Sequence, residues 1–127
     1  MSEAGLTTRR EADGAIVVEV RGTLDAATVD ALRNDLLATL SAHRPVAMTV
    51  DLTYVTFMDS MGVGALVAGH HAARDVGTRF SLRNPSEFVH HQLLITGLAG
   101  MFGLPTAYPS GYASIQPPTV ADTFRPA

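Results

Sequence analysis

Apolar residues in this chain recur with alternating periods, which predict strands and helices in turn. The β-branched run Ala15–Val20 lies between Gly14 and Gly22 and predicts a strand that ends at Gly22. Leu6–Arg10 is expected to pair with it as a hairpin. Val46–Leu52 is a nearly continuous apolar run, which is typical of a strand covered on both faces. We therefore place this last strand at the centre of a sheet.

Two longer segments carry apolar residues at helical spacing. The first is Ala26–His43, and Pro45 stands just beyond its end. The second is Ser60–Val76, and Gly77 follows it where a left-handed residue would end a helix. Both segments are predicted to be amphipathic helices of ordinary length.

The remaining elements complete an alternation of strands and helices. Arg79–Arg83 predicts a short strand, and the turn Asn84-Pro85-Ser86 opens a third helix that runs to about Thr96, with Gly97 as its cap. Such alternation predicts an α/β fold with short connections. We expect a mixed, mostly parallel sheet of about four to five strands with about three to four helices.

The chain is expected to form one domain over residues 1–108. Its 127 residues fit a single domain, and a hydrophobic content of 46% is enough for one core. Prolines and few charges follow, so residues 109–127 are expected to form a Pro-rich, weakly ordered tail. Thr106–Tyr108 is a candidate edge strand, and one helical turn is expected near Ala113.

Composition and charge exclude several kinds of partner. The formal net charge is -3 and the nine cationic residues are scattered arginines, so no basic patch and no nucleic-acid partner are expected. The absence of cysteine excludes disulfides and thiolate metal sites. Residues 1–19 lack a signal-peptide core, and the apolar runs are too short to cross a bilayer. We expect a soluble cytoplasmic monomer, because elements are predicted to cover both sheet faces.

The segment Asp51–Val67 holds the candidate chemistry. An apolar strand runs into Asp59 and Ser60, and either residue could cap the second predicted helix. If Asp59 is the cap, the Ser60 hydroxyl is left pointing outward from the first turn. A phosphoryl group there would meet the free N–H groups of a helix start and add about -1.5 to -2 of charge beside Asp59. Ser60 is therefore either a structural cap or a phosphorylatable switch.

Three motifs occur in an order and spacing found in a known family. They are Gly22-Thr23-Leu24-Asp25, then Asp51-Leu52-Thr53 leading to Phe57-Met58-Asp59-Ser60-Met61-Gly62-Val63-Gly64, and finally Asn84-Pro85-Ser86 followed by Thr96-Gly97-Leu98. With these motifs, the span from Leu6 to Tyr108 resembles a STAS-domain anti-sigma factor antagonist of bacteria.

The resemblance implies a role in partner switching. In such proteins the unphosphorylated antagonist binds an anti-sigma factor, usually a kinase of the histidine-kinase-like ATPase type, and so releases a sigma factor for transcription. The kinase phosphorylates the serine after the motif aspartate, the complex separates, and a phosphatase resets it. Nucleotide and magnesium belong to the kinase, so the resemblance implies no cofactor and no catalytic residue here. It places phosphorylation on Ser60 and partner binding on Asp25, Asp59, Ser60, Met61 and Gly62.

Some of these positions have a second interpretation. Asp25 could equally be the structural cap of a helix that starts at Ala26. Met61 stands where the family usually has a small residue, and its flexible side chain beside Ser60 would change the surface that a kinase contacts. Thr23 replaces a commonly acidic residue and Gln92 a usually apolar one. The C-terminal helix usual in the family is weak or missing.

Other functions are weighed against the switch. The main alternative is a STAS domain used without phosphorylation, as a docking subunit of a lipid-transport ATPase or of a signalling assembly. A serine hydrolase is not expected, because a nucleophile elbow needs glycine where Met58 stands. The chain has no lysine, which excludes a phosphate-binding loop with its lysine. The five histidines lack the helical i, i+4 spacing of a shared metal site, so no metal is expected.

Overall fold

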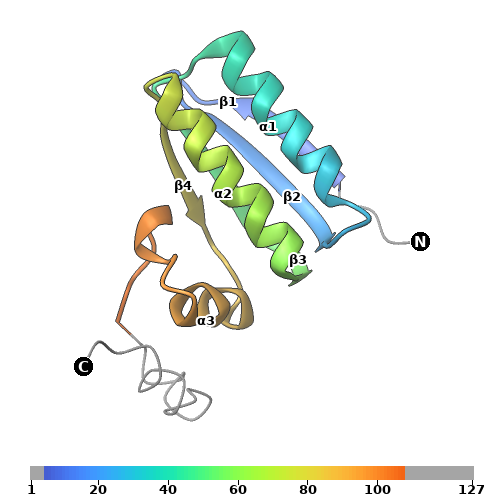
Figure 1. The fold of residues 1–127 in the computed structure, drawn as a ribbon. Helices are drawn as coiled ribbons and strands as arrows, with labels where there is room; N and C mark the ends of the chain where they lie inside the picture. Colours follow the sequence, from blue (N-terminus) through green and yellow to red (C-terminus); the bar gives the residue numbers. More distant parts are fainter. Residues whose placement is uncertain (1–4, 108–127) are drawn as a thin grey trace.

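The computed structural model describes residues 5–107, which form a four-stranded sheet with helices (Figure 1). The elements in chain order are β1 (Gly5–Arg10), β2 (Ile16–Leu24), α1 (Val29–His43), β3 (Ala47–Met58), α2 (Ser60–Asp75), β4 (Arg79–Arg83), α3 (Glu87–Ile95) and the 3₁₀ helix η1 (Gly100–Phe102). The strand order is β1-β2-β3-β4, with β1 antiparallel to β2 and the other pairs parallel. The predicted α/β class, the hairpin and the mixed, mostly parallel sheet are confirmed.

Helices α1 and α2 lie side by side on one face of the sheet (Figure 1). Buried side chains at matched positions of the strands, such as Val18 on β2, Val50 on β3 and Leu82 on β4, form one core with the helices. α3 lies beyond the carboxyl end of the parallel strands and adds Val89 and Leu93 to this core. The strand residues that face these helices are apolar because α1, α2 and α3 bury them.

The other face of the central strands carries polar side chains. The hydroxyl oxygens of Thr49 and Ser81 lie 3.3 Å apart, and the Arg83 guanidinium lies 3.4 Å from the Asp51 carboxylate. Within residues 5–107, α1 and α2 lie on the same face of the sheet (Figure 1), so the prediction that β3 is covered on both faces is wrong there. The apolar run misled because its residues alternate between the two faces. Met48 and Val50 belong to the core under the helices, whereas Thr49 and Asp51 have polar partners on the other face. Coverage of both sheet faces therefore no longer supports a monomer, and the monomeric state stays a prediction.

Two further differences from the predictions have identifiable reasons. β2 continues past Gly22, because this glycine adopts a φ of 97° next to a register shift and so marks a bulge in the strand. Thr106 and Ala107 form no strand, because the chain turns back on η1 and the Leu104 N–H donates to the Ala99 carbonyl. Tyr108, the third residue of that predicted strand, and the predicted tail lie outside the described residues.

The predicted helix-ending glycines after α2 and α3 and the predicted start of α3 are confirmed. Gly77 and Gly97 follow α2 and α3 with φ values of 76° and 78°, the left-handed conformation expected of C-terminal glycines. Ser86 caps α3 by accepting a hydrogen bond of 3.1 Å from the Val89 N–H. These local signals were sufficient because each depends on residues within one helical turn.

Asp51 is expected to make the stability of the fold depend on pH. It is 6% exposed. Burial raises its pKa, but hydrogen bonds from Thr53 and the charge of Arg83 outweigh this effect and hold the pKa below its ordinary value of 3.8. A carboxyl whose pKa is lower in the folded state stabilises the fold above its unfolded pKa. That stabilisation is lost as pH falls below 3.8 through the folded pKa.

Asp51→Asn is therefore expected to flatten the acid-side fall in the free energy of unfolding. Urea denaturation of wild type and variant over a pH series through this range would measure the two slopes. Asp75→Asn, at the exposed end of α2, is the matched control and should keep the wild-type slope. An unchanged slope in Asp51→Asn would mean that ionised Asp51 does not stabilise the fold.

Candidate functional site

Asp59 caps α2 and leaves the neighbouring serine exposed. The Asp59 Oδ1 accepts hydrogen bonds of 2.9 Å from the Met61 N–H and 3.2 Å from the Gly62 N–H. Ser60 is the first residue of the helix, and its side chain lies at the surface. Of the two possible caps the structure therefore selects Asp59, and the Ser60 hydroxyl is accessible to a partner.

This cap changes what a phosphoryl group on Ser60 would meet. The Met61 and Gly62 N–H groups already donate to the Asp59 carboxylate, and the Val63 N–H donates to the Asp59 carbonyl at 3.1 Å. The expectation that these donors are free is wrong, because the adjacent carboxylate occupies them. A phosphoryl group would instead add its charge directly beside an existing negative charge.

Asp25 lies next to this helix start although it is distant in sequence. Leu24 is paired with Met58 at the ends of β2 and β3, and the Leu24 carbonyl accepts a hydrogen bond of 3.0 Å from the Asp59 N–H. Asp25 and Ser60 are each one residue beyond this bonded pair. The structure therefore brings together the acidic residue and the serine that the resemblance assigns to one site.

The carboxylate of Asp25 organises a turn and does not cap α1. Its Oδ1 accepts a 3.0 Å hydrogen bond from the Ala27 N–H, and the Thr28 hydroxyl lies 3.3 Å away. α1 begins only at Val29, three residues later than predicted, because this turn occupies the chain before it. The alternative that Asp25 caps a helix starting at Ala26 is wrong.

Gly62 allows α2 to pass close to the end of β2. The residue is buried, and a Cβ at this position would lie 2.7 Å from the Leu24 carbonyl oxygen and 2.8 Å from both Leu24 Cβ and Met58 Cγ. No side chain fits in that space. Gly62 therefore contributes to the candidate site through the position of its backbone, which sets Ser60 beside the loop of Asp25.

Two exposed aromatic residues flank the helix start, and the motif analysis did not assign them to the site. Phe57 on β3 and Phe88 on α3 are 44% and 56% exposed, and their stacked rings have centroids 6.3 Å apart. Phe88 lies off the buried stripe formed by Val89 and Leu93, and this offset is the sequence signal that could have found it. With Met61, which is 47% exposed, they place three large apolar side chains at the surface near Ser60.

Residues 7–105 match a protein-family model described as the Mlab, STAS domain. The chain belongs to the STAS domain family. The likeness to a STAS domain expected from the three motifs is thus confirmed, and it covers every described helix and nearly every described strand residue.

Solved structures of the same fold include anti-sigma factor antagonists. SpoIIAA in its unphosphorylated form aligns with a TM-score of 0.69 and 21% identity, over 87% of this STAS domain chain and 95% of that chain. An anti-sigma factor antagonist from Mycobacterium paratuberculosis aligns with a TM-score of 0.66 and 26% identity, over 88% of this chain and 93% of that chain. The phosphorylated form of the Bacillus cell fate determinant SpoIIAA aligns with a TM-score of 0.64 and 21% identity, over 87% of this chain and 98% of that chain.

Departures of this STAS domain from the family pattern have local explanations. Gln92, in place of an apolar residue, donates a 2.8 Å hydrogen bond from its side-chain amide to the Met58 carbonyl, so it ties α3 to the end of β3. The Thr23 backbone carbonyl accepts a 2.7 Å hydrogen bond from the Thr28 hydroxyl, and this bond does not depend on which side chain residue 23 carries. The Met61 side chain is 47% exposed, so packing of the core does not restrict its size.

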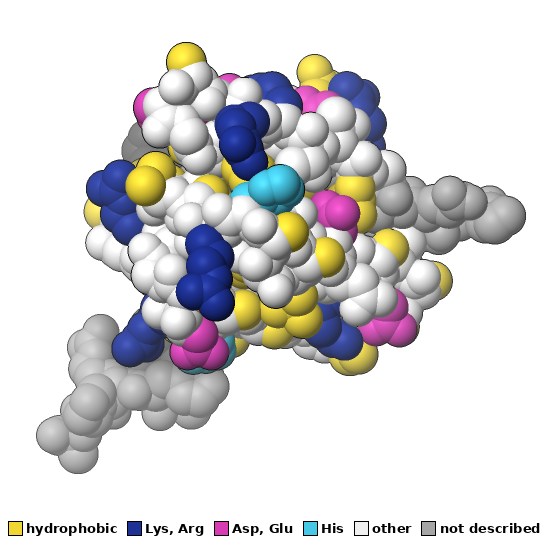
Figure 2. Space-filling view, turned by 90° about the horizontal axis from the view of Figure 1, so that it is seen from above, with side chains coloured by type: hydrophobic (Ala, Val, Ile, Leu, Met, Phe, Trp, Pro, Cys, Tyr) yellow, Lys and Arg dark blue, Asp and Glu magenta, His cyan; other side chains and the backbone are white. Residues whose placement is uncertain are grey.

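Residues 5–107 of the STAS domain contain no group of three or more His, Asp or Glu side chains placed to hold a metal ion. Over the same residues, no helix is both long and apolar enough to span a membrane. In Figure 2 the arginine side chains on the visible face are separated from one another, and carboxylates lie beside some of them. That face therefore carries no continuous basic patch.

Removing the Asp59 cap is expected to destabilise the STAS domain measurably. Asp59→Ala deletes the acceptor of two N–H groups, and loss of an N-cap costs about 1 kcal/mol. Asp59→Asn retains a capping oxygen and should lose much less, because asparagine and aspartate are about equally good N-caps. Urea denaturation of both variants gives the comparison. Equal losses would show that the charge of Asp59 stabilises the helix start and that its hydrogen bonds do not.

Proposed function

We propose that this STAS domain is an anti-sigma factor antagonist, and that phosphorylation of Ser60 switches off its binding to an anti-sigma factor. The observation that carries the proposal is the exposed Ser60 hydroxyl at the start of α2, beside Asp59 and the Asp25 turn. The overlap with antagonists whose structures are known in unphosphorylated and phosphorylated forms supports the same class of partner.

In the unphosphorylated state the partner would bind across the helix start. Phe57, Met61 and Phe88 offer apolar surface there, and exposed aromatic and methionine side chains are frequent anchors of protein interfaces. Binding of this kind buries the Ser60 hydroxyl, which is neutral. The proposed interface includes Asp25 and Asp59 at its polar margin.

Phosphorylation would oppose that binding through charge. The γ-phosphoryl group of ATP passes to Ser60 Oγ, ADP leaves, and the hydroxyl proton goes to a base on the kinase. The new group meets the Asp59 carboxylate, which already holds the Met61 and Gly62 N–H groups. With few donors left to compensate it, the added charge makes desolvation of this surface costly.

We propose that the other components lie outside this chain. The partner is an anti-sigma factor of the histidine-kinase-like ATPase type, which supplies nucleotide and magnesium for the transfer. A phosphatase restores the Ser60 hydroxyl by hydrolysis. This chain then contributes a phosphoacceptor and a binding surface, with no catalytic side chain of its own.

A second candidate function is a docking subunit of a lipid-transport ATPase or signalling assembly. The observation that favours it is Met61, a large flexible side chain exposed next to Ser60. The family description that matches this chain is compatible with either candidate. In the docking role Ser60 stays unmodified.

Capture from native lysate with added ATP tests the proposal. Wild-type protein and Ser60→Ala serve as baits, retained proteins are identified by mass spectrometry, and phosphate is mapped on each bait. We expect Ser60→Ala to retain an anti-sigma factor with a kinase domain, and the wild type to release that protein as phosphate appears at Ser60. Retention of a transport ATPase with no phosphate at Ser60 would reject the switch in favour of the docking role.

A further inference from the structure

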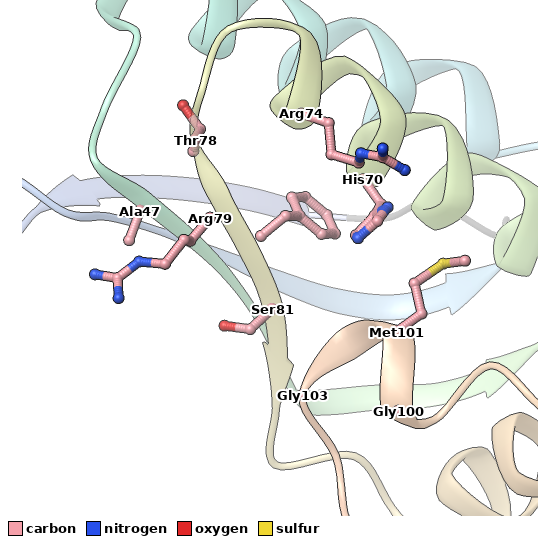
Figure 3. A pocket seen from close by; sticks show the side chains of 10 residues that line it. Ala47, His70, Arg74, Thr78, Arg79, Ser81, Gly100, Met101 and Gly103 are labelled. Atoms are coloured by element: carbon pink, nitrogen blue, oxygen red, sulfur yellow. The ribbon is translucent and has the colours of Figure 1, made fainter.

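A cavity of about 570 Å³ opens beside β4, at the end of α2 remote from Ser60 (Figure 3). β4 is an edge strand that pairs only with β3 within the described part of the chain. Arg74 of α2 lines the cavity and lies 14 residues beyond Ser60, or about 21 Å along the helix at 1.5 Å per residue. The cavity is therefore separate from the proposed phosphorylation site.

The titratable side chains that line this cavity are all basic residues. They are His70 and Arg74 on α2 and Arg79 on β4, and no carboxylate lines the cavity. Four other arginines each pair with a carboxylate, namely Arg9, Arg21, Arg33 and Arg83. Between residues 5 and 107, neither Arg74 nor Arg79 has a carboxylate within ion-pair distance. The positive charge around the cavity is thus uncompensated.

His70 and Arg74 converge on one part of the cavity. Their side chains point into the same space, whereas Arg79 and Ser81 point to the other side of β4 (Figure 3). Burial and the positive charges of His71 and Arg74 lower the pKa of His70. The His70 Nδ1 is buried without a hydrogen-bond partner in the described structure. An anion between the two side chains would relieve this repulsion and accept their N–H groups.

Apolar side chains complete the wall near this pair. The Phe80 ring lies edge-on to the His70 ring, with centroids 6.2 Å apart, and Met101 of η1 lines the same cavity. The volume falls within the range of about 300–1,000 Å³ common for small-molecule sites. Apolar walls with few convergent polar groups are typical of sites for organic ligands.

We infer that this cavity binds a small organic anion, whose carboxylate or phosphate group pairs with Arg74 and His70 and whose apolar body lies against Phe80 and Met101. The guanidinium of Arg74 can hold either group through two parallel hydrogen bonds. The inference does not depend on the phosphorylation of Ser60.

Titration of isotope-labelled protein followed by NMR tests the site. The probes are benzoate, phenyl phosphate and the neutral benzyl alcohol. We expect saturable shifts at His70, Phe80 and Met101 with at least one of the two anions, and about tenfold weaker or no binding of benzyl alcohol. The stronger of the two anions identifies the preferred group. Bound anion should also raise the pKa of His70, because a nearby negative charge favours the protonated ring.

Two variants separate a built site from general charge attraction. Arg74→Gln is expected to weaken binding of the preferred anion about tenfold. Arg33→Gln, the same change at an exposed position of α1, should bind that anion like wild type. Amide spectra of both variants verify that they are folded. Absence of saturable shifts with both anions, or equal weakening in the two variants, would overturn the inference. So would benzyl alcohol binding as tightly as the anions.

Discussion

Ser60→Asp is expected to weaken binding of the anti-sigma partner about 5- to 150-fold, which corresponds to about 1–3 kcal/mol. The variant places a carboxylate at the exposed first residue of α2, beside Asp59. The first-turn N–H groups of Met61 and Gly62 already donate to Asp59, so they cannot compensate the new charge. The cost of burying it under a partner is therefore not offset within this chain.

Isothermal titration of the purified partner into each variant measures this effect. Ser60→Ala should bind as tightly as the unphosphorylated wild type and keep its stability, because Ser60 makes no capping hydrogen bond to the helix. Ser41→Asp is the charge control, since it adds a carboxylate to exposed Ser41 on α1. Equal affinities for Ser60→Asp and Ser41→Asp would contradict a switch at Ser60.

Gly62→Ala is expected to lower the free energy of unfolding by about 1–3 kcal/mol, the usual cost of overpacking a filled site. The added methyl would meet the Leu24 carbonyl oxygen at 2.7 Å. This oxygen belongs to the backbone of β2 and accepts the Asp59 N–H, so it cannot move aside cheaply. Relief of the clash has to shift α2 away from the end of the sheet.

Gly64→Ala is the matched control for this prediction. Gly64 lies in the same helix, and nothing lies within 4 Å of the Cβ that alanine would add. Alanine is there expected to stabilise the protein by about 0.5–1 kcal/mol, because glycine in a helix loses more backbone entropy on folding. Urea denaturation of both variants compares them. A stabilised Gly62→Ala would mean that the close approach of α2 to β2 is not maintained in solution.

The two predictions are linked through the geometry of the site. The close contact at Gly62 holds the first turn of α2 against the loop that contains Asp25. Any shift of that turn also moves Ser60 relative to Asp25 and the exposed aromatic pair. Gly62→Ala is therefore expected to weaken partner binding as well, whereas Gly64→Ala should bind like wild type.

Some features could be predicted from the sequence because their causes lie within a few residues. The apolar spacing of α1 and α2 is set by one helical turn at a time. Gly77 and Gly97 end helices because glycine alone adopts a positive φ without steric cost. The motif around Ser60 likewise limited the helix cap to two neighbouring residues.

Other local signals were ambiguous because several backbone geometries satisfy them. Gly22 could end a strand or form a bulge, and the pairing of β2 with β3 selected the bulge. Asp25 was predicted to bind a partner or to cap a helix that starts at Ala26, and hydrogen bonds from Ala27 and Thr28 to its carboxylate form a turn in place of that cap. In both cases partners outside the motif decided between the alternatives.

By itself the sequence determined the α/β order of elements, most helix ends and the placement of a serine at the start of α2, since each follows from local periodicity or capping. Only the tertiary structure decided which sheet face is covered, that Gly62 packs on Leu24, and that Phe57 stacks on Phe88. The cavity beside β4 also arises only when α2 and η1 meet at the sheet edge. These features depend on contacts between residues distant in the chain, and local residue patterns do not specify such distances.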